Sequence, residues 1–190
     1  MTKLLLTVVA TFALSTPAQA KPESWYWGFH LGGGSAAFNG TLGSKVSTYN
    51  SNPSLYPTTM ASKLFFLWPI SEEGLLGVSS GGAIKFYSND ANVSQSATAG
   101  QSMLTLSYMH RFGPEHGRGW YFKGDAGMGV ASAQDNILTP NTNLTRIGLG
   151  FCFEAGYGIG LSDETALLIG AEVGGASGNS YYAFSVGPLF

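Results

Sequence analysis

The chain has 190 residues, of which 44% are hydrophobic, 13% aromatic and 11% charged, and its formal net charge is −2. This length suits one domain, and its charge content is well below the roughly one quarter usual in soluble domains. Nine Lys and Arg are too few for a nucleic-acid binder. One cysteine excludes an intrachain disulfide framework and a cysteine-rich zinc site.

The first twenty residues, MTKLLLTVVATFALSTPAQA, have the three parts of a secretory signal peptide. Lys3 supplies the positive charge, the run from Leu4 to Leu14 is apolar, and Ala18-Gln19-Ala20 is a cleavage site. The run is shorter than the ~20 apolar residues of a spanning helix. We therefore expect residues 1–20 to be removed, leaving one domain of residues 21–190. No later stretch is long and apolar enough for a membrane helix.

The rest of the chain alternates between two kinds of side chain with a period of two, which is typical of strands. Residues 145–157, TRIGLGFCFEAGY, place large apolar side chains in one phase and Gly, Cys, Arg or Glu in the other. The same pattern recurs over residues 25–32, 76–86, 104–112, 120–130, 165–173 and 182–190. Residues 61–69 are apolar on both faces, and the sequence does not determine the register of residues 55–70. Together these segments predict eight strands.

The second phase of the strands decides between two all-β folds. In a soluble secreted β-sandwich, the alternative fold, this phase would face water and be rich in charge. Here it is mainly Gly, Ala and Ser with single charges. Small residues with a few charges suit the narrow lumen of an eight-stranded barrel, whose apolar phase faces lipid. We therefore predict an eight-stranded antiparallel transmembrane β-barrel.

Two further patterns support this fold. Long connections (37–60, 89–101 and 132–143, with a shorter one at 176–180) alternate with short turns (71–74, 113–119 and 162–164), as in bacterial outer-membrane barrels. Aromatic residues gather where the strands meet the short turns, which predicts an interfacial girdle. Its six members are Trp25, Trp68, Phe112, Trp120, Tyr157 and Phe190.

The ending Tyr181-Tyr182-Ala183-Phe184-Ser185-Val186-Gly187-Pro188-Leu189-Phe190, with the signal peptide and the eight strands, resembles small outer-membrane β-barrel proteins of Gram-negative bacteria. No motif indicates a subfamily. The resemblance implies an outer-membrane location, contact with outer-membrane lipid and lipopolysaccharide, and recognition of Phe190 by the barrel assembly machinery.

Charged side chains in the lumen phase are expected to pair with one another and close the barrel, because unpaired buried charges are costly. The expected network comprises His30, Lys85, Arg111, Lys123, Asp125, Arg146, Glu154 and Glu172, with Lys63 joining it. Lys123 and Glu154, on neighbouring strands, are the expected pair. A small gated, porin-like pore or a proton-accessible His30 is the alternative.

Catalysis is not expected. A lipid A deacylase, an activity known on this fold, needs a His and a Ser on the outer face. His110 lies in the lipid-facing phase, but Phe112 stands where a His-x-Ser spacing requires Ser. His116 is expected in a solvated turn, and the lone Cys152 is expected to pack rather than react. Three dispersed histidines do not predict a metal site, and we expect no cofactor.

The longest loop, from Ala37 to Met60, is rich in Ser, Thr, Asn and Gly and is expected to be a solvated cap. Tyr49, Leu55 and Tyr56 are its candidates for contact with an extracellular ligand. A polyanionic partner is disfavoured, because the loops carry little positive charge. The predicted function is structural or surface-interactive. A small pore is the alternative, and a lipid A-modifying enzyme is the weakest.

Overall fold

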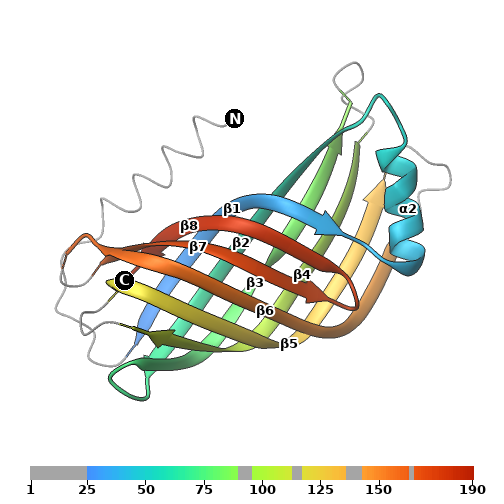
Figure 1. The fold of residues 1–190 in the computed structure, drawn as a ribbon. Coiled ribbons are helices and arrows are strands. Elements are labelled where there is room, and N and C mark those ends of the chain that lie inside the picture. The colour runs from blue at the N-terminus through green and yellow to red at the C-terminus, as the bar shows by residue number, and fades with distance from the viewer. Residues whose placement is uncertain (1–24, 90–95, 113–116, 136–142, 163–164) are drawn as a thin grey trace.

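The protein forms a closed antiparallel barrel in which each strand pairs with the next and β1 pairs with β8 (Figure 1). The computed structural model describes residues 25–89, 96–112, 117–135, 143–162 and 165–190. The predicted signal peptide, His116 and parts of the predicted loops and turns lie outside these ranges. Among the described residues, no helix is both long and apolar enough to cross a membrane. The elements are β1 (Tyr26–Ala37), α2 (Gly40–Asn50), β2 (Tyr56–Pro69), β3 (Gly74–Ser88), β4 (Ser96–Arg111), β5 (Gly119–Asp135), β6 (Leu144–Gly160), β7 (Ala166–Ala176) and β8 (Ser180–Leu189).

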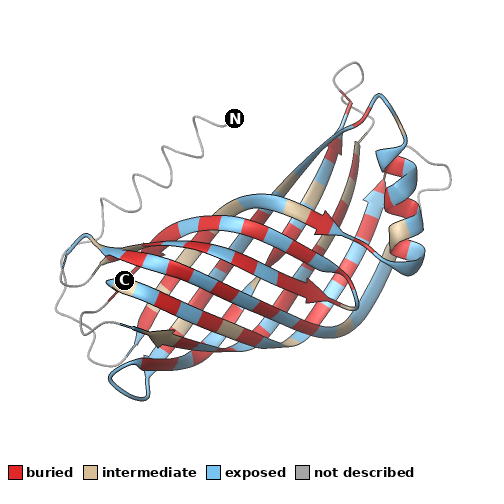
Figure 2. Cartoon of the chain, in the orientation of Figure 1, coloured by how far each residue is buried: buried red, intermediate tan, exposed pale blue. Residues whose placement is uncertain are grey.

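Burial alternates along every strand, with the apolar phase outside (Figure 2). On β6, Leu149 is 83% exposed and Phe153 49% exposed, whereas Cys152 and Glu154 are buried. A large apolar outer surface over polar inner residues is the reverse of a soluble protein. The predicted eight-stranded barrel is therefore confirmed, and the soluble sandwich is wrong.

Of residues 55–70, whose register the sequence left open, Tyr56–Pro69 form β2. Lys63 is opposite His30 and Leu67 is opposite Tyr26, so these residues point inward, while Leu64 and Trp68 point outward. Both faces are apolar here because the lumen near the short turns is filled by an apolar cluster. Its members are Tyr26, Phe65, Leu67, Leu75, Met109, Tyr121, Ala166, Leu168 and Leu189.

The other end of the lumen is covered by α2, which lies at the long-loop end of the barrel (Figure 1). The prediction that residues 37–60 form a solvated loop is therefore wrong for α2. Its buried residues Leu42, Lys45, Val46 and Tyr49 follow the i, i+3, i+4, i+7 spacing of one helix face.

A turn at the same end anchors the start of α2. Ser177 and Gly178 both have positive φ, as a type I′ hairpin turn requires, and the Asn179 amide donates to the Ala176 carbonyl at 3.0 Å. Asn39, next to α2, donates two hydrogen bonds to this turn: its backbone amide donates to Asn179 Oδ1, and its side-chain Nδ2 donates to the Gly178 carbonyl. The β7–β8 turn thus fixes the position of the helical cap.

Candidate functional site: the lumen ion cluster and its helical cap

Lys63 lies at the centre of a buried ion cluster that crosses the lumen. Its Nζ lies 2.5 Å from Glu172 Oε2, 2.9 Å from Glu154 Oε2 and 3.5 Å from Asp125 Oδ2. Lys63 is on β2, whereas Glu154 is on β6, four places away in the ring of eight strands. These contacts therefore join opposite walls of the barrel.

Glu154 is held by two further side chains. His30 Nδ1 on β1 lies 3.0 Å from its Oε1, and Tyr121 on β5 donates a hydrogen bond of 2.6 Å to the same oxygen. Glu172 stands directly opposite Glu154 in the β6–β7 register. Like charges directly opposite each other destabilise a sheet, so Lys63, which contacts both carboxylates, is the compensating charge.

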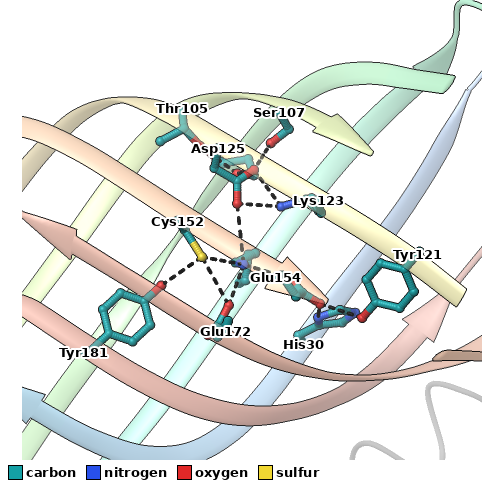
Figure 3. Close-up of polar contacts among 12 residues, drawn as sticks. His30, Thr105, Ser107, Tyr121, Lys123, Asp125, Cys152, Glu154, Glu172 and Tyr181 are labelled. Carbon is teal, nitrogen blue, oxygen red and sulfur yellow. Dashed lines mark hydrogen bonds and ion pairs between the residues drawn. The ribbon is translucent and has the colours of Figure 1, made fainter. Parts of the chain in front are cut away.

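Asp125 forms the second half of the cluster (Figure 3). Lys123 Nζ lies 2.7 Å from both of its carboxylate oxygens. The hydroxyls of Ser79 and Ser107 also donate to it. Lys123 and Glu154 do face each other in the register, but the contacts observed are Lys123 with Asp125 and Lys63 with Glu154. The predicted Lys123–Glu154 pair is therefore wrong.

The structure brings together only part of the predicted network. Lys85 is at the long-loop end and donates to Asn50 of α2, Arg146 is exposed and donates to Thr41, and Arg111 donates to the Glu72 carbonyl at the short-turn end. Placing these three in the lumen cluster was wrong, because their phase indicates the face of the strand but not their height along it. The residues that do meet in the cluster are His30, Lys123, Asp125, Glu154 and Glu172, with Lys63.

A second polar centre fastens α2 to the barrel wall. Asp135 Oδ2 at the end of β5 lies 2.8 Å from Lys45 Nζ and accepts a hydrogen bond of 2.6 Å from the Tyr49 hydroxyl. Burial and the neighbouring carboxylate raise the pKa of Tyr49 well above its ordinary value. The Tyr49 ring also packs edge-on against Tyr87, with centroids 5.3 Å apart. The cap is therefore held by both ionic and aromatic contacts.

These contacts correct the predicted ligand-contact residues. Tyr49 is 2% exposed and Leu55 is 7% exposed, so neither presents a surface to a ligand, whereas Tyr56 is 57% exposed. The sequence does contain a signal for this helix and for the burial of Tyr49, because the spacing of Leu42, Val46 and Tyr49 is that of one helix face.

The six predicted girdle residues lie at the short-turn end of their strands. Trp25, Trp68, Phe112, Trp120 and Tyr157 are exposed, and Phe190 is half-buried against Trp27, with centroids 4.6 Å apart. His110 lies among them, with Nε2 3.7 Å from Glu73 Oε2 and its ring edge-on to Phe112.

Within the described ranges, no group of three or more His, Cys, Asp or Glu is placed to hold a metal ion. In the lumen cluster, the Lys63 ammonium stands between the carboxylates.

Comparison with solved structures identifies the fold. The attachment invasion locus protein Ail of Yersinia pestis, solved with the heparin analogue sucrose octasulfate, has a TM-score of 0.53 at 9% identity, covering 88% of this chain and 97% of Ail. Neisserial surface protein A (TM-score 0.46, 12% identity, 90% and 98% covered) and the outer membrane protein OprG of Pseudomonas aeruginosa (0.45, 11%, 88% and 94%) are also similar. No family model matches the chain, and no curated protein matches it significantly in sequence. The chain therefore has the fold of the small eight-stranded outer-membrane β-barrels of bacteria, with the lipid-facing outer surface of a membrane-spanning protein.

Proposed function

We propose that this protein is a closed outer-membrane scaffold that stabilises the membrane and presents its long-loop end to the cell exterior. In bacterial outer-membrane barrels the longer loops are extracellular, so α2 would lie on the outside. The outer-membrane location agrees with the fold.

The observation that carries this proposal is the ion cluster across the lumen. Its side chains come from β1, β2, β5, β6 and β7, and each is at most 5% exposed. An ion passing this level would have to separate Lys63 from its carboxylates, and breaking a buried pair costs about 3–5 kcal/mol. The cap of α2 is a second obstacle above it. A filled lumen supports a scaffold rather than an open channel.

The surface offered by the cap is polar and nearly uncharged. Ser44, Ser47 and Thr48 are on the exposed face of α2, and Tyr56 is exposed beside it. The helix α2 itself presents no exposed cation to a sulfated ligand such as that of Ail, since Lys45 is buried against Asp135. Lys85 and Arg146, at its edge, donate to Asn50 and Thr41. We therefore propose a neutral ligand surface with Tyr56 as its aromatic contact.

Planar-bilayer recording tests the closed lumen. The wild-type barrel should produce no steady conductance, whereas K123A or E154A, which leave charged partners unpaired in the lumen, should allow openings. K85M is the matched control, because Lys85 lies outside the cluster. If the wild-type barrel instead shows a steady conductance, and K123A and E154A each change the size of that conductance, the protein is a pore.

Surface binding is tested with intact cells on immobilised neutral glycans, with heparin as the sulfated comparison. Cells with the wild-type barrel should adhere to the neutral glycans rather than to heparin, and S47E/Y56E should reduce adhesion without changing the amount of folded barrel. S71E, in the short turn on the opposite side, is the matched control. Equal adhesion of cells with and without the barrel would leave only the membrane-stabilising role, measured as detergent resistance.

We also propose that the protein has no lipid-modifying activity. His110 has Glu73 nearby, but its outer-face neighbour is Phe112 rather than a serine. Mass spectrometry of lipid A from cells with and without the barrel should give identical profiles. A changed lipid A mass would contradict this and direct attention to His110.

A further inference from the structure

The outer wall of the barrel contains a hollow of about 330 Å³ over β1 to β4. Its sides include Leu31, Leu64 and Ile84, of which Leu64 and Ile84 are 42% and 43% exposed. Its lining also includes the exposed serines Ser62, Ser80 and Ser102, here called its floor, and the buried residues His30, Lys63 and Gln101. The volume is at the lower end of the range for small-molecule pockets. The hollow is therefore large enough to hold part of a ligand.

The hollow exists because small residues meet in one row across three strands. Ser62 on β2 is opposite Gly82 on β3, which is opposite Ser102 on β4. A Cβ atom at Gly82 would lie 1.9 Å from the Gln101 carbonyl oxygen, so a larger residue would force the backbones apart. Closer to the short turns, the same outer face carries Leu76, Trp68 and Leu106. The lipid-facing wall is thus deeply indented at one place.

The floor carries an unmet hydrogen-bonding requirement. Within the described part of the chain, the hydroxyls of Ser62, Ser80 and Ser102 form no side-chain hydrogen bond. Lipid hydrocarbon offers no partner to such groups, and leaving them unpaired costs free energy. An empty hollow would also lose the dispersion contacts of its walls. Whatever fills it has to be apolar at the sides and able to hydrogen-bond at the floor.

We propose that this hollow binds one lipid acyl chain that carries a hydroxyl group. The hollow opens on the lipid-facing surface, so the surrounding acyl chains have direct access to it. An acyl chain is narrow enough to enter, whereas a second barrel presents a convex wall that cannot follow the concave floor. A hydroxyl on the chain would both donate to and accept from the serine hydroxyls. The proposal rests on the barrel lying in a membrane, and it is independent of what α2 binds.

Native mass spectrometry tests the proposal on the intact barrel released from detergent. The probes are a synthetic phosphatidylethanolamine with an unmodified chain and a series of the same lipid with one hydroxyl at successive chain positions. The best member of the series should be retained about fivefold more strongly than the unmodified lipid, as expected for one neutral hydrogen bond. The triple variant S62A/S80A/S102A should remove this preference while still retaining lipid.

Filling the hollow provides the second arm. S80L and S102L should each abolish specific retention of the hydroxylated lipid, because leucine occupies the floor. S132L, a serine-to-leucine change on the outer face of β5 outside the hollow, is the matched control and should bind like wild type. Electrophoretic mobility before and after heating checks that every variant is folded.

The results that overturn the proposal are distinct. Equal retention of hydroxylated and unmodified lipids by the wild-type barrel would remove the hydroxyl preference. Unchanged retention in S80L and S102L would place the lipid elsewhere. A barrel dimer that S80L dissociates would show that protein, not lipid, covers this face. None of these results alters the conductance or adhesion tests, so failure here is separable from failure of the proposed function.

Discussion

Replacing Lys63 with methionine should strongly destabilise the barrel. The change keeps a long unbranched side chain but removes the ammonium that stands 2.5, 2.9 and 3.5 Å from three carboxylates. At an effective dielectric constant of about 20, each contact corresponds to roughly 5–7 kcal/mol of attraction before the opposing cost of burying Lys63. Removing one partner of a buried ion pair has a net cost of about 3–5 kcal/mol, and we expect K63M to lose stability in this range.

The assay is urea unfolding of the barrel in lipid vesicles, followed by tryptophan fluorescence. K85M is the matched control, since Lys85 is a partly exposed lysine on the neighbouring strand that contacts no carboxylate among the described residues: its ammonium donates to Asn50 and lies 5.3 Å from the centre of the Tyr87 ring. Its free energy of unfolding should change by no more than about 0.5 kcal/mol, as for most surface substitutions.

The destabilisation caused by K63M should also depend on pH. Acidification that protonates Asp125 and Glu154 leaves neutral carboxyls that need no cation, so the difference in free energy of unfolding between K63M and wild type should narrow. A loss below about 1 kcal/mol at neutral pH, or a K63M value equal to that of K85M, would refute the assigned role of Lys63.

The remaining predictions concern the cap and the ring closure. Y49F removes the hydrogen bond to Asp135 and should weaken docking of α2 by about 1.5–3 kcal/mol, as for a bond to a charged group; a fluorophore on S47C would report greater cap mobility. Because the pKa of Tyr49 is raised in the folded state, its neutral hydroxyl stabilises the cap below the unfolded pKa of about 10, and this stability should be lost as pH rises above it. The same label should show cap release at alkaline pH in wild type and a weaker transition in Y49F, whereas a pH-independent signal would contradict the docking contact. F190A removes the stacking on Trp27 and should cost about 0.5–1.5 kcal/mol in urea unfolding; an unchanged midpoint would show that the pair adds nothing to closure.

The sequence predicted the strands and the inward residues well because a strand has a strict period of two. Once Glu154 was assigned to one phase of β6, Cys152 and Gly156 had to follow it inward, and the structure agrees. The period of two did not predict correctly whether Lys85 and Arg146 join the lumen ion cluster. Their phase is inward, but they lie at the long-loop end, where contact with α2 is nearer than the lumen cluster.

The partners within the cluster could not be read from adjacent strands. Lys63 contacts Glu154 from the opposite side of the barrel. Such a contact requires both residues to lie at the same level along the barrel axis, and that level depends on the stagger between strands. The helical cap was missed for a different reason. Its weak helix formers acquire a preferred structure through long-range contacts such as Lys45 with Asp135, which lies far along the chain.

The closed ring also constrains how the barrel is made. The backbone N–H and C=O groups on the edge of β1 that does not face β2 have no hydrogen-bond partners in the sheet until β8, the last strand, pairs with that edge. Within hydrocarbon, an unpaired strand edge is too costly to persist. Insertion strand by strand would expose such an edge at every stage, so the sheet has to close as one cooperative event. Pairings this distant in sequence are slow to form, which makes the time before closure the period in which the chain is most vulnerable to aggregation and proteolysis.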